Sequence, residues 1–334
     1  KISGQQAKPV GADTGLKDIK HIATALLHTL GKPTGSVEHC DLTPEYKKHV
    51  LKFIEPGLKK LKMVVDASNG MAGKMVPAIF SELPIEIIPI NFEHNGIFKH
   101  DPNPLVEANQ AEAKALVKSK GADFGACFDG DADRVIAISP EGETIDGDFI
   151  LAITAKYLKE RDRLPGNTIV TTVMANLGLD IAMRNNGIKV LKTKVGDRFV
   201  LEEMQKAGAV VGGEQSGHII LSDYATTGDG LLTACNLIKI MRETSMGITE
   251  LAGVMRKLPQ ILLNIRVKNK AFESCSEICE AINDADKALN GRGRILVRCS
   301  GTEDLVRVMA EGPDENEIKK IAGDISELIA KNLC

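Results

Sequence analysis

The stretch Phe128-Asp129-Gly130-Asp131-Ala132-Asp133-Arg134 places three carboxylates at every second position, with an arginine directly after them. Apolar runs at 124–127 and 135–138 flank it, which predicts a strand, an acidic loop and a second strand. In a tight loop, side chains at alternate positions can turn toward one point. At roughly 5 Å and an effective dielectric constant of about 20, each carboxylate pair would repel by about 3 kcal/mol. The loop therefore predicts a bound cation, and its all-oxygen ligands favour Mg²⁺ or Ca²⁺.

Two other interpretations of the acidic loop are an EF-hand and a solvated turn. An EF-hand needs glycine at its sixth position and glutamate at its twelfth, whereas counting from Asp129 these are Arg134 and Pro140. The solvated turn, without a metal, stays open as the plain structural alternative. We favour a metal site with Asp129, Asp131 and Asp133 as its ligands.

Composition describes an ordinary globular chain of two or three domains. Of 334 residues, 43% are hydrophobic and 26% charged, and the net charge of −3 gives no sign of a nucleic-acid or anionic-membrane partner. We expect no membrane span and no signal peptide, because no apolar run is long enough. Seven cysteines without a CxxC pair fit the reduced thiols of a cytoplasmic protein. Aromatic residues make up only 4%, which argues against base-stacking platforms.

The order of apolar patterns predicts the domain organisation. Strand and helix patterns alternate from residue 43 to residue 257, which is typical of mostly parallel α/β sheets. After Pro259 the order becomes strand, helix, strand, strand, helix. The predicted fold class is therefore α/β, with tandem mixed α/β domains plus a small C-terminal α+β domain. The expected borders give residues 1–42 as the remnant of a first domain, then 43–147, 148–257 and 258–334.

A second polar loop, Gly-Gly-Glu-Gln-Ser-Gly-His, occupies residues 212–218 after a predicted strand. Its glycines let the backbone approach a ligand closely. Glu214 and Ser216 would point to the same side and offer an acceptor and a donor–acceptor to sugar hydroxyls. The structural alternative is a tight turn with a polar tip. His218 is a third candidate for substrate binding, although a lone histidine here is more often structural.

A third loop lies between two predicted strands of the last domain and contains Arg298, Ser300, Gly301 and Thr302, with Arg307 following. Backbone N–H groups of a Ser-Gly-Thr turn, two hydroxyls and the arginines form a plausible nest for a phosphate. Each charge-assisted hydrogen bond contributes roughly 1.5–3 kcal/mol. The structural alternative is a hairpin turn flanked by a surface arginine.

The three loops occur in the order and rough spacing of the α-D-phosphohexomutases, and this resemblance covers nearly the whole chain. It implies four domains, three α/β units and a C-terminal phosphate-binding domain. In such enzymes the acidic loop holds Mg²⁺, the Glu-x-Ser loop reads the sugar, and the last loop holds the substrate's non-transferred phosphate. We therefore expect Arg134 to be catalytic and a small hexose phosphate to be the partner. The sequence sets no oligomeric state, and a homodimer is the assembly to test.

The resemblance also implies a mechanism. A phosphoserine gives its phosphoryl group to a hexose monophosphate, the hexose 1,6-bisphosphate turns over in the cleft, and its other phosphate returns to the serine. This chemistry depends on in-line geometry and charge neutralisation more than on a reactive side chain.

The chain departs from this family in one large respect. The catalytic loop of the form Thr-x-Ser-His-Asn-Pro does not occur, and residues 1–4 resemble the segment that follows it. We therefore expect the chain to lack nearly all of the first domain, and to bind substrate without turning it over. Ala132 and Asp304 are smaller departures, and neither removes a ligand.

The identity of the sugar depends on conflicting segments. Residues 194–198, with Asp197 and Arg198 as candidate substrate-binding residues, resemble phosphoglucosamine mutases, and so do 226–230 and 258–262. Residues 95–104 resemble the phosphomannomutase/phosphoglucomutase branch instead. We predict conversion of glucosamine 6-phosphate to glucosamine 1-phosphate, with the other branch as the alternative.

Two rival classes complete the hypotheses. A haloacid-dehalogenase-like phosphatase also carries an Asp-x-Asp loop after a strand, but it usually has threonine or valine where this chain has Asp133. The other rival is a sugar-phosphate-binding protein without catalysis.

Overall fold

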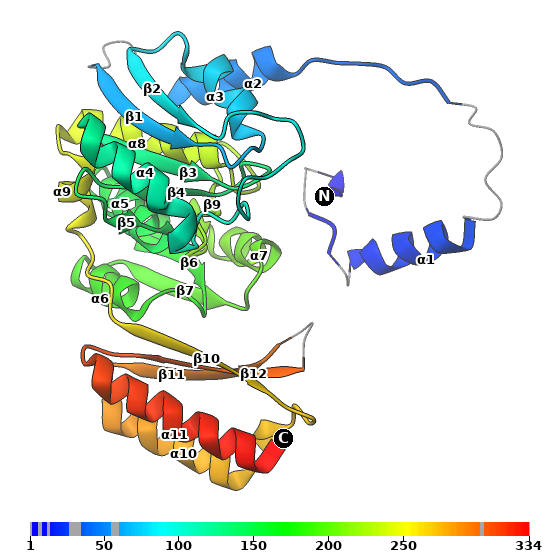
Figure 1. The fold of residues 1–334 in the computed structure, drawn as a ribbon, viewed down its shortest axis with the longest axis vertical. Helices are drawn as coiled ribbons and strands as arrows, with labels where there is room; N and C mark the ends of the chain where they lie inside the picture. Colours follow the sequence, from blue (N-terminus) through cyan, green and yellow to red (C-terminus); the bar gives the residue numbers. More distant parts are fainter. Residues whose placement is uncertain are drawn as a thin grey trace. The chain divides into compact units, whose positions relative to one another are not determined.

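The computed structural model describes residues 2–5, 9–11, 14–26, 35–54, 60–300 and 304–333. Its contacts divide the chain into two compact units (Figure 1). Unit 1 comprises Lys1–Ala175 and Asn185–Val254, and unit 2 comprises Asn176–Arg184 and Met255–Cys334. Each unit contains strands and helices of the predicted kinds, and the predicted α/β fold class is confirmed.

The first sheet of unit 1 has the strand order β2-β1-β3-β4-β5. Its strands are β1 (Leu61–Asp66), β2 (Ile85–Ile90), β3 (Phe124–Phe128), β4 (Val135–Ile138) and β5 (Thr144–Ile145). The strands β2, β1 and β3 run parallel, whereas β4 and β5 are antiparallel to their neighbours. The acidic loop therefore joins two strands, as the flanking apolar runs predicted, and these strands are antiparallel neighbours within the sheet.

Apolar side chains on both faces explain why these strands are buried. All residues of β3 and β4 are buried, as expected for central strands without polar alternation. Helix α3 (Ala72–Phe80) follows β1, and α4 (Glu107–Lys120) contacts β1 and β3. Helix α4 ends at Gly121, whose left-handed conformation is usual for a helix terminus.

The second sheet of unit 1 has the order β7-β6-β8-β9. Its strands are β6 (Thr168–Thr172), β7 (Lys189–Thr193), β8 (Val211–Gly213) and β9 (Ile219–Leu221). The first three are parallel, and β8 and β9 form an antiparallel hairpin whose loop carries Glu214. Helix α7 (Asp197–Ala207) packs its Val200, Leu201 and Met204 against this sheet. Helices α5 (Gly147–Lys159), α8 (Gly230–Thr244) and α9 (Ile248–Ala252) contact one another.

Two helices precede these sheets. Apolar residues at helical spacing predict a helix over 16–30, and the structure shows α1 (Leu16–Leu26), while residues 27–30 lie outside the described part of the chain. None of the residues of α1 is buried. Helix α2 (Thr43–Val50) has proline near its first turn, where the missing N–H removes no helical hydrogen bond, and it contacts α3 and α8.

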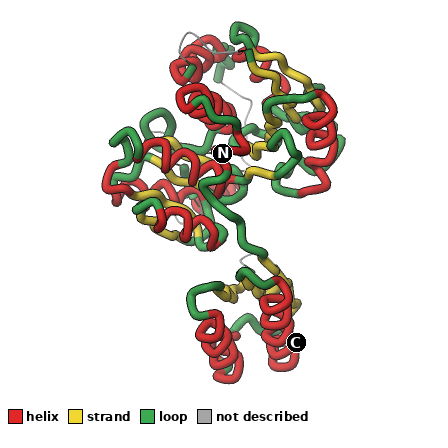
Figure 2. Tube along the Cα trace, turned by 90° about the vertical axis from the view of Figure 1, so that its left-hand side faces the viewer, coloured by secondary structure: helices red, strands yellow, loops and turns green. Residues whose placement is uncertain are grey.

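Unit 2 is a three-stranded antiparallel sheet covered by two helices. The strand order is β10-β12-β11, with β10 (Gln260–Arg266), β11 (Arg294–Cys299) and β12 (Leu305–Glu311). Helices α10 (Ser276–Leu289) and α11 (Glu315–Leu333) lie side by side on one face of the sheet (Figures 1 and 2). Their apolar stripes close a core around Ile278, Val308 and Ile325. Helix α6 (Leu177–Asn185) packs mainly with this unit.

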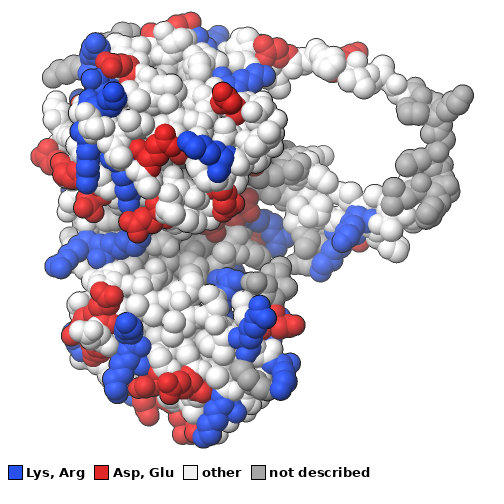
Figure 3. Space-filling view, viewed as in Figure 1, with Lys and Arg blue, Asp and Glu red and all other residues white. Residues whose placement is uncertain are grey.

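Within the described residues, no helix is both long and apolar enough to cross a membrane. Basic and acidic side chains are interspersed over the face drawn in Figure 3. The borders predicted at residues 42, 147 and 257 stay predictions.

Candidate metal and sugar-phosphate site

The acidic loop folds so that its three carboxylates converge. One oxygen from each of Asp129, Asp131 and Asp133 lies within 4.8 Å of the other two. Asp129 is buried, Asp133 is half-buried and Asp131 is exposed. Ala132 takes a left-handed conformation (φ 60°), which bends the loop back between the two strands. The spacing of the carboxylates thus leads to the predicted convergence, while their role as metal ligands remains a prediction.

Arg134 is held inside this cluster. Its Nε donates to Asp129 Oδ2 at 2.7 Å, its backbone N–H donates to Asp129 Oδ1 at 3.1 Å, and Nε lies 3.6 Å from Asp133 Oδ1. Burial nevertheless raises the pKa of the Asp129 carboxyl, because desolvation outweighs the lowering by Arg134, and Asp131 raises it further. One guanidinium does not balance three carboxylates. The donor set therefore suits a hard divalent cation.

A pocket of about 350 Å³ opens beside the triad. The pocket is lined by residues of the acidic loop, of the segment 194–198 and of the loop at 212–218: Asp131, Asp133, Arg134, Val195, Gly196, Asp197, Glu214, Ser216 and His218. The Ser216 hydroxyl oxygen is buried and has no hydrogen-bond partner among the described residues. A buried hydroxyl of this kind is expected to bond to a ligand or to water.

The position of Glu214 is fixed by a neighbouring loop. The backbone N–H of Gly196 donates to Glu214 Oε1 at 3.0 Å. Gly196 has φ 133°, a conformation that L side chains rarely adopt, so glycine is required where the backbone approaches Glu214. Glu214 was predicted from the sequence but its anchor was not, because a lone glycine before a helix gives no specific signal.

Backbone hydrogen bonds join the acidic loop at 129–134 (the metal loop) and the start of β4 to the loop at 212–218 (the sugar loop) and to the start of α8. Val135 N–H donates to Gly217 O at 3.2 Å, and Gly230 N–H donates to Ala132 O at 2.9 Å. A Cβ on Gly217 would collide with the carbonyl of Val135. The two loops are therefore held in register by main-chain contacts that a larger side chain at Gly217 would break.

His218 lines the pocket but is 4% exposed. Its Nε2 accepts a hydrogen bond from Gly228 N–H at 3.2 Å and lies 3.8 Å from Asp133 Oδ2. Because Nε2 serves as an acceptor, the neutral ring carries its proton on Nδ1. The contact with Gly228 gives His218 a structural role, and its predicted contact with substrate stays a prediction.

Arg198 is not among the residues that line this pocket in the described part of the chain. Its guanidinium lies 4.8 Å above the Phe199 ring, and its Nε is 3.6 Å from Glu202. Its neighbour Asp197 does line the pocket and accepts a hydrogen bond from the Arg198 backbone N–H at 2.7 Å. The structure thus brings only one of these two predicted residues to the site.

In unit 2, two predicted phosphate-binding arginines lie opposite each other. Arg298 on β11 and Arg307 on β12 are direct cross-strand partners. Burial lowers the pKa of Arg298, and the charge of Arg307 lowers it further. Two like charges across a strand pair destabilise it unless an anion neutralises them. This arrangement fits the prediction of a phosphate site.

The rest of the predicted phosphate loop is only partly described. Gly301 and Thr302 lie outside the described residues. Ser300 is buried, and its N–H donates to Leu305 O at 2.8 Å. Lys270, which was not predicted, places its ammonium 3.3 Å from Ser300 O and 3.2 Å from Asp304. The distance in sequence between Lys270 and this loop left no pattern to find.

Comparison with protein families gives three matches in chain order. The profile described as phosphoglucomutase/phosphomannomutase, alpha/beta/alpha domain II, matches residues 44–142. The profile for domain III matches residues 146–258, and that for the C-terminal domain matches residues 262–328.

Individual proteins agree with these matches. A phosphoglucosamine mutase from Alkaliphilus oremlandii is 45% identical over 307 residues, which are 91% of this chain and 68% of that protein. The chain spans about two thirds of the length of the curated relatives it matches.

Solved structures show the same fold. A phosphoglucomutase/phosphomannomutase family protein from Burkholderia thailandensis has a TM-score of 0.79 at 25% identity, covering 95% of this chain and 71% of that chain. The N-acetylphosphoglucosamine mutase of Aspergillus fumigatus, solved with GlcNAc-6P and magnesium, has a TM-score of 0.71 at 19% identity, covering 86% and 66%. The chain belongs to the phosphoglucomutase/phosphomannomutase family, the α-D-phosphohexomutases.

Proposed function

We propose that this chain supplies the metal-binding, sugar-binding and phosphate-binding parts of a phosphoglucosamine mutase, which interconverts glucosamine 6-phosphate and glucosamine 1-phosphate. The single observation that carries the proposal is the pocket that Asp131 and Asp133 of the acidic triad line together with Glu214 and Ser216. The name of the relatives that are about 45% identical supports the choice of sugar. The segment at 95–104 supports the phosphomannomutase/phosphoglucomutase branch as the alternative.

Asp129, Asp131 and Asp133 would hold Mg²⁺. When bound, this ion neutralises charge on the phosphoryl group in transfer, which is the main requirement of such chemistry. The magnesium in the Aspergillus fumigatus structure, a protein of the same fold, supports this choice of ion. Arg134 adds a cation next to the triad, since its Nε lies 2.7 Å from Asp129 Oδ2 and 3.6 Å from Asp133 Oδ1.

The sugar is oriented by the chain's own side chains. The Glu214 carboxylate, held by Gly196 N–H, accepts hydrogen bonds from sugar hydroxyls. The Ser216 hydroxyl, buried without a partner among the described residues, donates to or accepts from a further hydroxyl. In unit 2, Arg298 and Arg307 bind the phosphate that is not transferred. The phosphoryl group comes from a phosphoserine outside this chain, by way of a hexose 1,6-bisphosphate.

Calorimetric titration of the chain with sugar phosphates, in the presence of Mg²⁺, tests the proposal. Glucosamine 6-phosphate should bind at least tenfold more tightly than mannose 6-phosphate, a difference of about 1.4 kcal/mol. Removal of the Glu214 carboxylate by Glu214→Gln should weaken the binding of both. A preference for mannose 6-phosphate would instead establish the alternative branch.

Turnover is tested in a version of the chain that also carries the serine loop of the family. Such a version should convert glucosamine 6-phosphate to the 1-phosphate, and conversion should stop when Asp131 is replaced by asparagine. Binding of the sugar phosphate without turnover in this version would identify a non-catalytic binding protein.

A further inference from the structure

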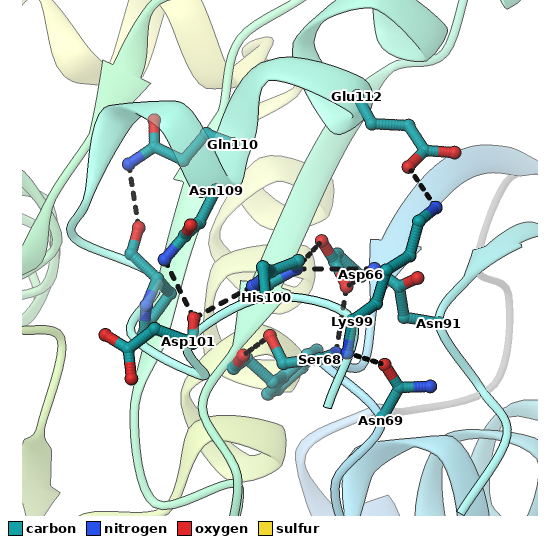
Figure 4. A network of polar contacts seen from close by, with 12 residues as sticks. Asp66, Ser68, Asn69, Asn91, Lys99, His100, Asp101, Asn109, Gln110 and Glu112 are labelled. Atoms are coloured by element: carbon teal, nitrogen blue, oxygen red, sulfur yellow. Dashed lines mark hydrogen bonds and ion pairs between the residues drawn. The ribbon is translucent and has the colours of Figure 1, made fainter. Parts of the chain in front are cut away.

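A buried carboxylate lies next to the metal loop and takes no part in the chemistry described above. Asp66 ends β1, which is the parallel neighbour of β3, and its register partner is Cys127. Its side chain is 1% exposed. Figure 4 shows it within a polar network that includes the turn after β1 and the connection between β2 and α4. A buried carboxylate is destabilising unless its oxygens are hydrogen-bonded, so its partners identify its role.

Asp66 fixes the turn that follows its own strand. Its Oδ1 accepts a hydrogen bond from Ser68 N–H at 2.8 Å and another from the Asn91 side-chain amide at 3.0 Å (Figure 4). Ser68 and Asn69 both adopt the left-handed conformation, with φ 47° and 53°. A non-glycine residue in this region is strained, and it persists only where surrounding contacts enforce it.

Asn69 forms further hydrogen bonds that hold the left-handed turn in place. Its Oδ1 accepts from Lys99 N–H at 3.0 Å (Figure 4). Its amide Nδ2 donates to Glu93 O, also at 3.0 Å. Its own N–H donates to Asn91 O at 2.8 Å. Two consecutive left-handed residues are thus held by bonds to the connection between β2 and α4.

The turn after β1 forms two hydrogen bonds to the backbone of the metal loop. The Ser68 hydroxyl donates to Phe128 O at 2.7 Å, and Met71 N–H donates to Gly130 O at 2.9 Å. These two carbonyls belong to the residues on either side of Asp129. The backbone that presents the buried metal-ligand candidate is therefore fixed on both sides from the turn after β1.

His100 lies beside the same carboxylate, in the same connection between β2 and α4 as Asn91. Its Nδ1 lies 2.8 Å from Asp101 O, a group that only accepts, so Nδ1 carries a proton. Its Nε2 lies 3.3 Å from the Asn91 amide nitrogen and 3.4 Å from Asp66 Oδ2 (Figure 4). The loop that contains His100 reaches the metal loop, because Phe98 and Pro102 lie 3.6 Å from the position that a Cβ on Gly130 would take.

We propose that Asp66 and Ser68 are positioning residues for the divalent-cation loop. Asp66 holds the left-handed turn at residues 68–69, and the turn holds the Ser68 hydroxyl against the Phe128 carbonyl. The backbone at Asp129 is thereby oriented so that the three carboxylates converge. This inference rests on the proposed metal site, and it assigns a metal-related role to residues about 60 positions away in the sequence.

The test measures Mn²⁺ affinity of the purified chain by electron paramagnetic resonance, with thermal unfolding recorded for every variant. Ser68→Ala removes the hydroxyl and keeps the strained Cβ, whereas Ser68→Gly removes the hydroxyl and relieves the strain. Both variants should bind Mn²⁺ about tenfold more weakly, the lower end of what loss of a residue supporting a metal ligand costs. Ser68→Gly should unfold at the higher temperature of the two.

Two further variants sharpen the assignment. Asp66→Asn keeps the oxygen that Ser68 N–H and Asn91 use, so its affinity for Mn²⁺ should fall less than that of Asp66→Ala. Ser139→Ala is the matched control, because Ser139 is also buried and accepts a hydrogen bond, from Glu143 N–H at 3.1 Å, but follows β4 at the end opposite to the triad. Its affinity for Mn²⁺ should not change.

The outcomes separate this inference from the function on which it rests. If Asp131→Asn abolishes Mn²⁺ binding while both Ser68 variants bind within twofold of the unmodified chain, the metal site stands and the positioning role is wrong. Affinity that follows unfolding temperature, with Ser68→Gly unaffected, would also overturn it. A chain that binds no Mn²⁺ would refute the proposed metal site itself.

Discussion

The acidic loop of unit 1 and the arginine pair of unit 2 are both concentrations of like charge, yet they are held in different ways. The carboxylates lie in a loop whose carbonyls are gripped by Ser68 and Met71, residues remote in sequence. Arg298 and Arg307 are cross-strand partners inside a regular ladder, so strand register alone places them. We infer that the metal loop depends on tertiary packing, whereas the arginine pair tolerates changes around it.

The largest expected effect breaks the packing of unit 1 without touching a charge. A Cβ on Gly70 would collide with the carbonyl of Gly130 in the metal loop. Gly70→Ala should therefore lower the free energy of unfolding of unit 1 by about 3 kcal/mol, the cost of overpacking a site that cannot yield. Urea unfolding monitors this stability, and Mn²⁺ binding should be lost in the same variant.

Gly323→Ala in helix α11 is the control, since nothing lies within 4 Å of its added Cβ. It should stabilise unit 2 by about 0.5–1 kcal/mol, because alanine is the better helix former. A Gly70→Ala variant as stable as the unmodified chain, with normal Mn²⁺ affinity, would show that the metal loop does not depend on this packing.

The second prediction concerns the arginine pair, where binding should change and stability should not. Arg298→Ala should weaken the binding of inorganic phosphate or a sugar phosphate by about 10- to 100-fold, through loss of one charge-assisted hydrogen bond. Unit 2 should be as stable as before or more stable, because the repulsion from Arg307 is removed. Isothermal titration and urea unfolding measure the two effects.

Arg292→Ala serves as the matched control, because it removes another arginine of unit 2 that lies outside the predicted phosphate loop. The guanidinium of Arg292 is exposed and lies 3.5 Å from Glu317, a surface ion pair of the kind that contributes little to stability. Its loss should leave phosphate binding unchanged. Equal losses of binding in both arginine variants would mean that phosphate responds to general charge rather than to the cross-strand pair.

The third prediction, with a smaller expected effect, concerns a hydrogen bond at the start of helix α8, which contacts the metal loop through Gly230. The Tyr46 hydroxyl lies 2.9 Å and 2.8 Å from the two carboxylate oxygens of Asp229, which caps helix α8. Tyr46→Phe should destabilise unit 1 by about 1–3 kcal/mol, since a buried acceptor loses its donor. In a double-mutant cycle, this cost should largely vanish on an Asp229→Ala background, which has no side-chain acceptor for the Tyr46 hydroxyl. Additive costs would show that the two side chains do not interact.

The smallest predicted effect is a pH dependence. Burial raises the pKa of Asp229, and this outweighs the lowering by hydrogen bonds from Leu232 and Tyr46. A raised folded-state pKa means that the folded chain binds the proton more tightly than the unfolded chain does. The contribution of this proton binding to the free energy of unfolding is complete below the ordinary aspartate pKa of 3.8. It is lost as pH rises through the folded-state pKa of Asp229.

Urea midpoints measured across the acid range check this sign. In Asp229→Asn, stability should gain relative to the unmodified chain as pH rises from below 3.8, until the folded-state pKa is passed. A constant difference between the two proteins over this range would contradict a raised pKa for Asp229.

Long or strongly patterned elements could be predicted from the sequence. The apolar pattern at residues 85–90 predicts a strand, which is observed as β2 (Ile85–Ile90), and the two strands around the acidic loop were also predicted. Strand β5 and helix α9 were missed, because two and five residues are too short to show a period. Local pattern decides the long elements, and tertiary contacts decide the short ones.

The candidate site divides in the same way. The triad could be predicted because its three carboxylates lie within five residues and their chemistry is local. The grip of Ser68 on Phe128 could not, because the two residues are 60 positions apart and neither carries a distinctive motif. Arg198 adjoins a pocket residue in sequence, yet its guanidinium lies over Phe199 instead.

The binding of a divalent metal by the acidic triad of unit 1 underlies the proposals above, and anomalous diffraction from crystals of the chain soaked in Mn²⁺ is its sharpest test. We predict one strong peak about 2.0–2.2 Å from an oxygen of each of Asp129, Asp131 and Asp133, the distance usual for a small hard cation. The peak should disappear in Asp131→Asn. The absence of an anomalous peak at the triad, or a peak that other residues coordinate, would contradict the assignment of this metal site.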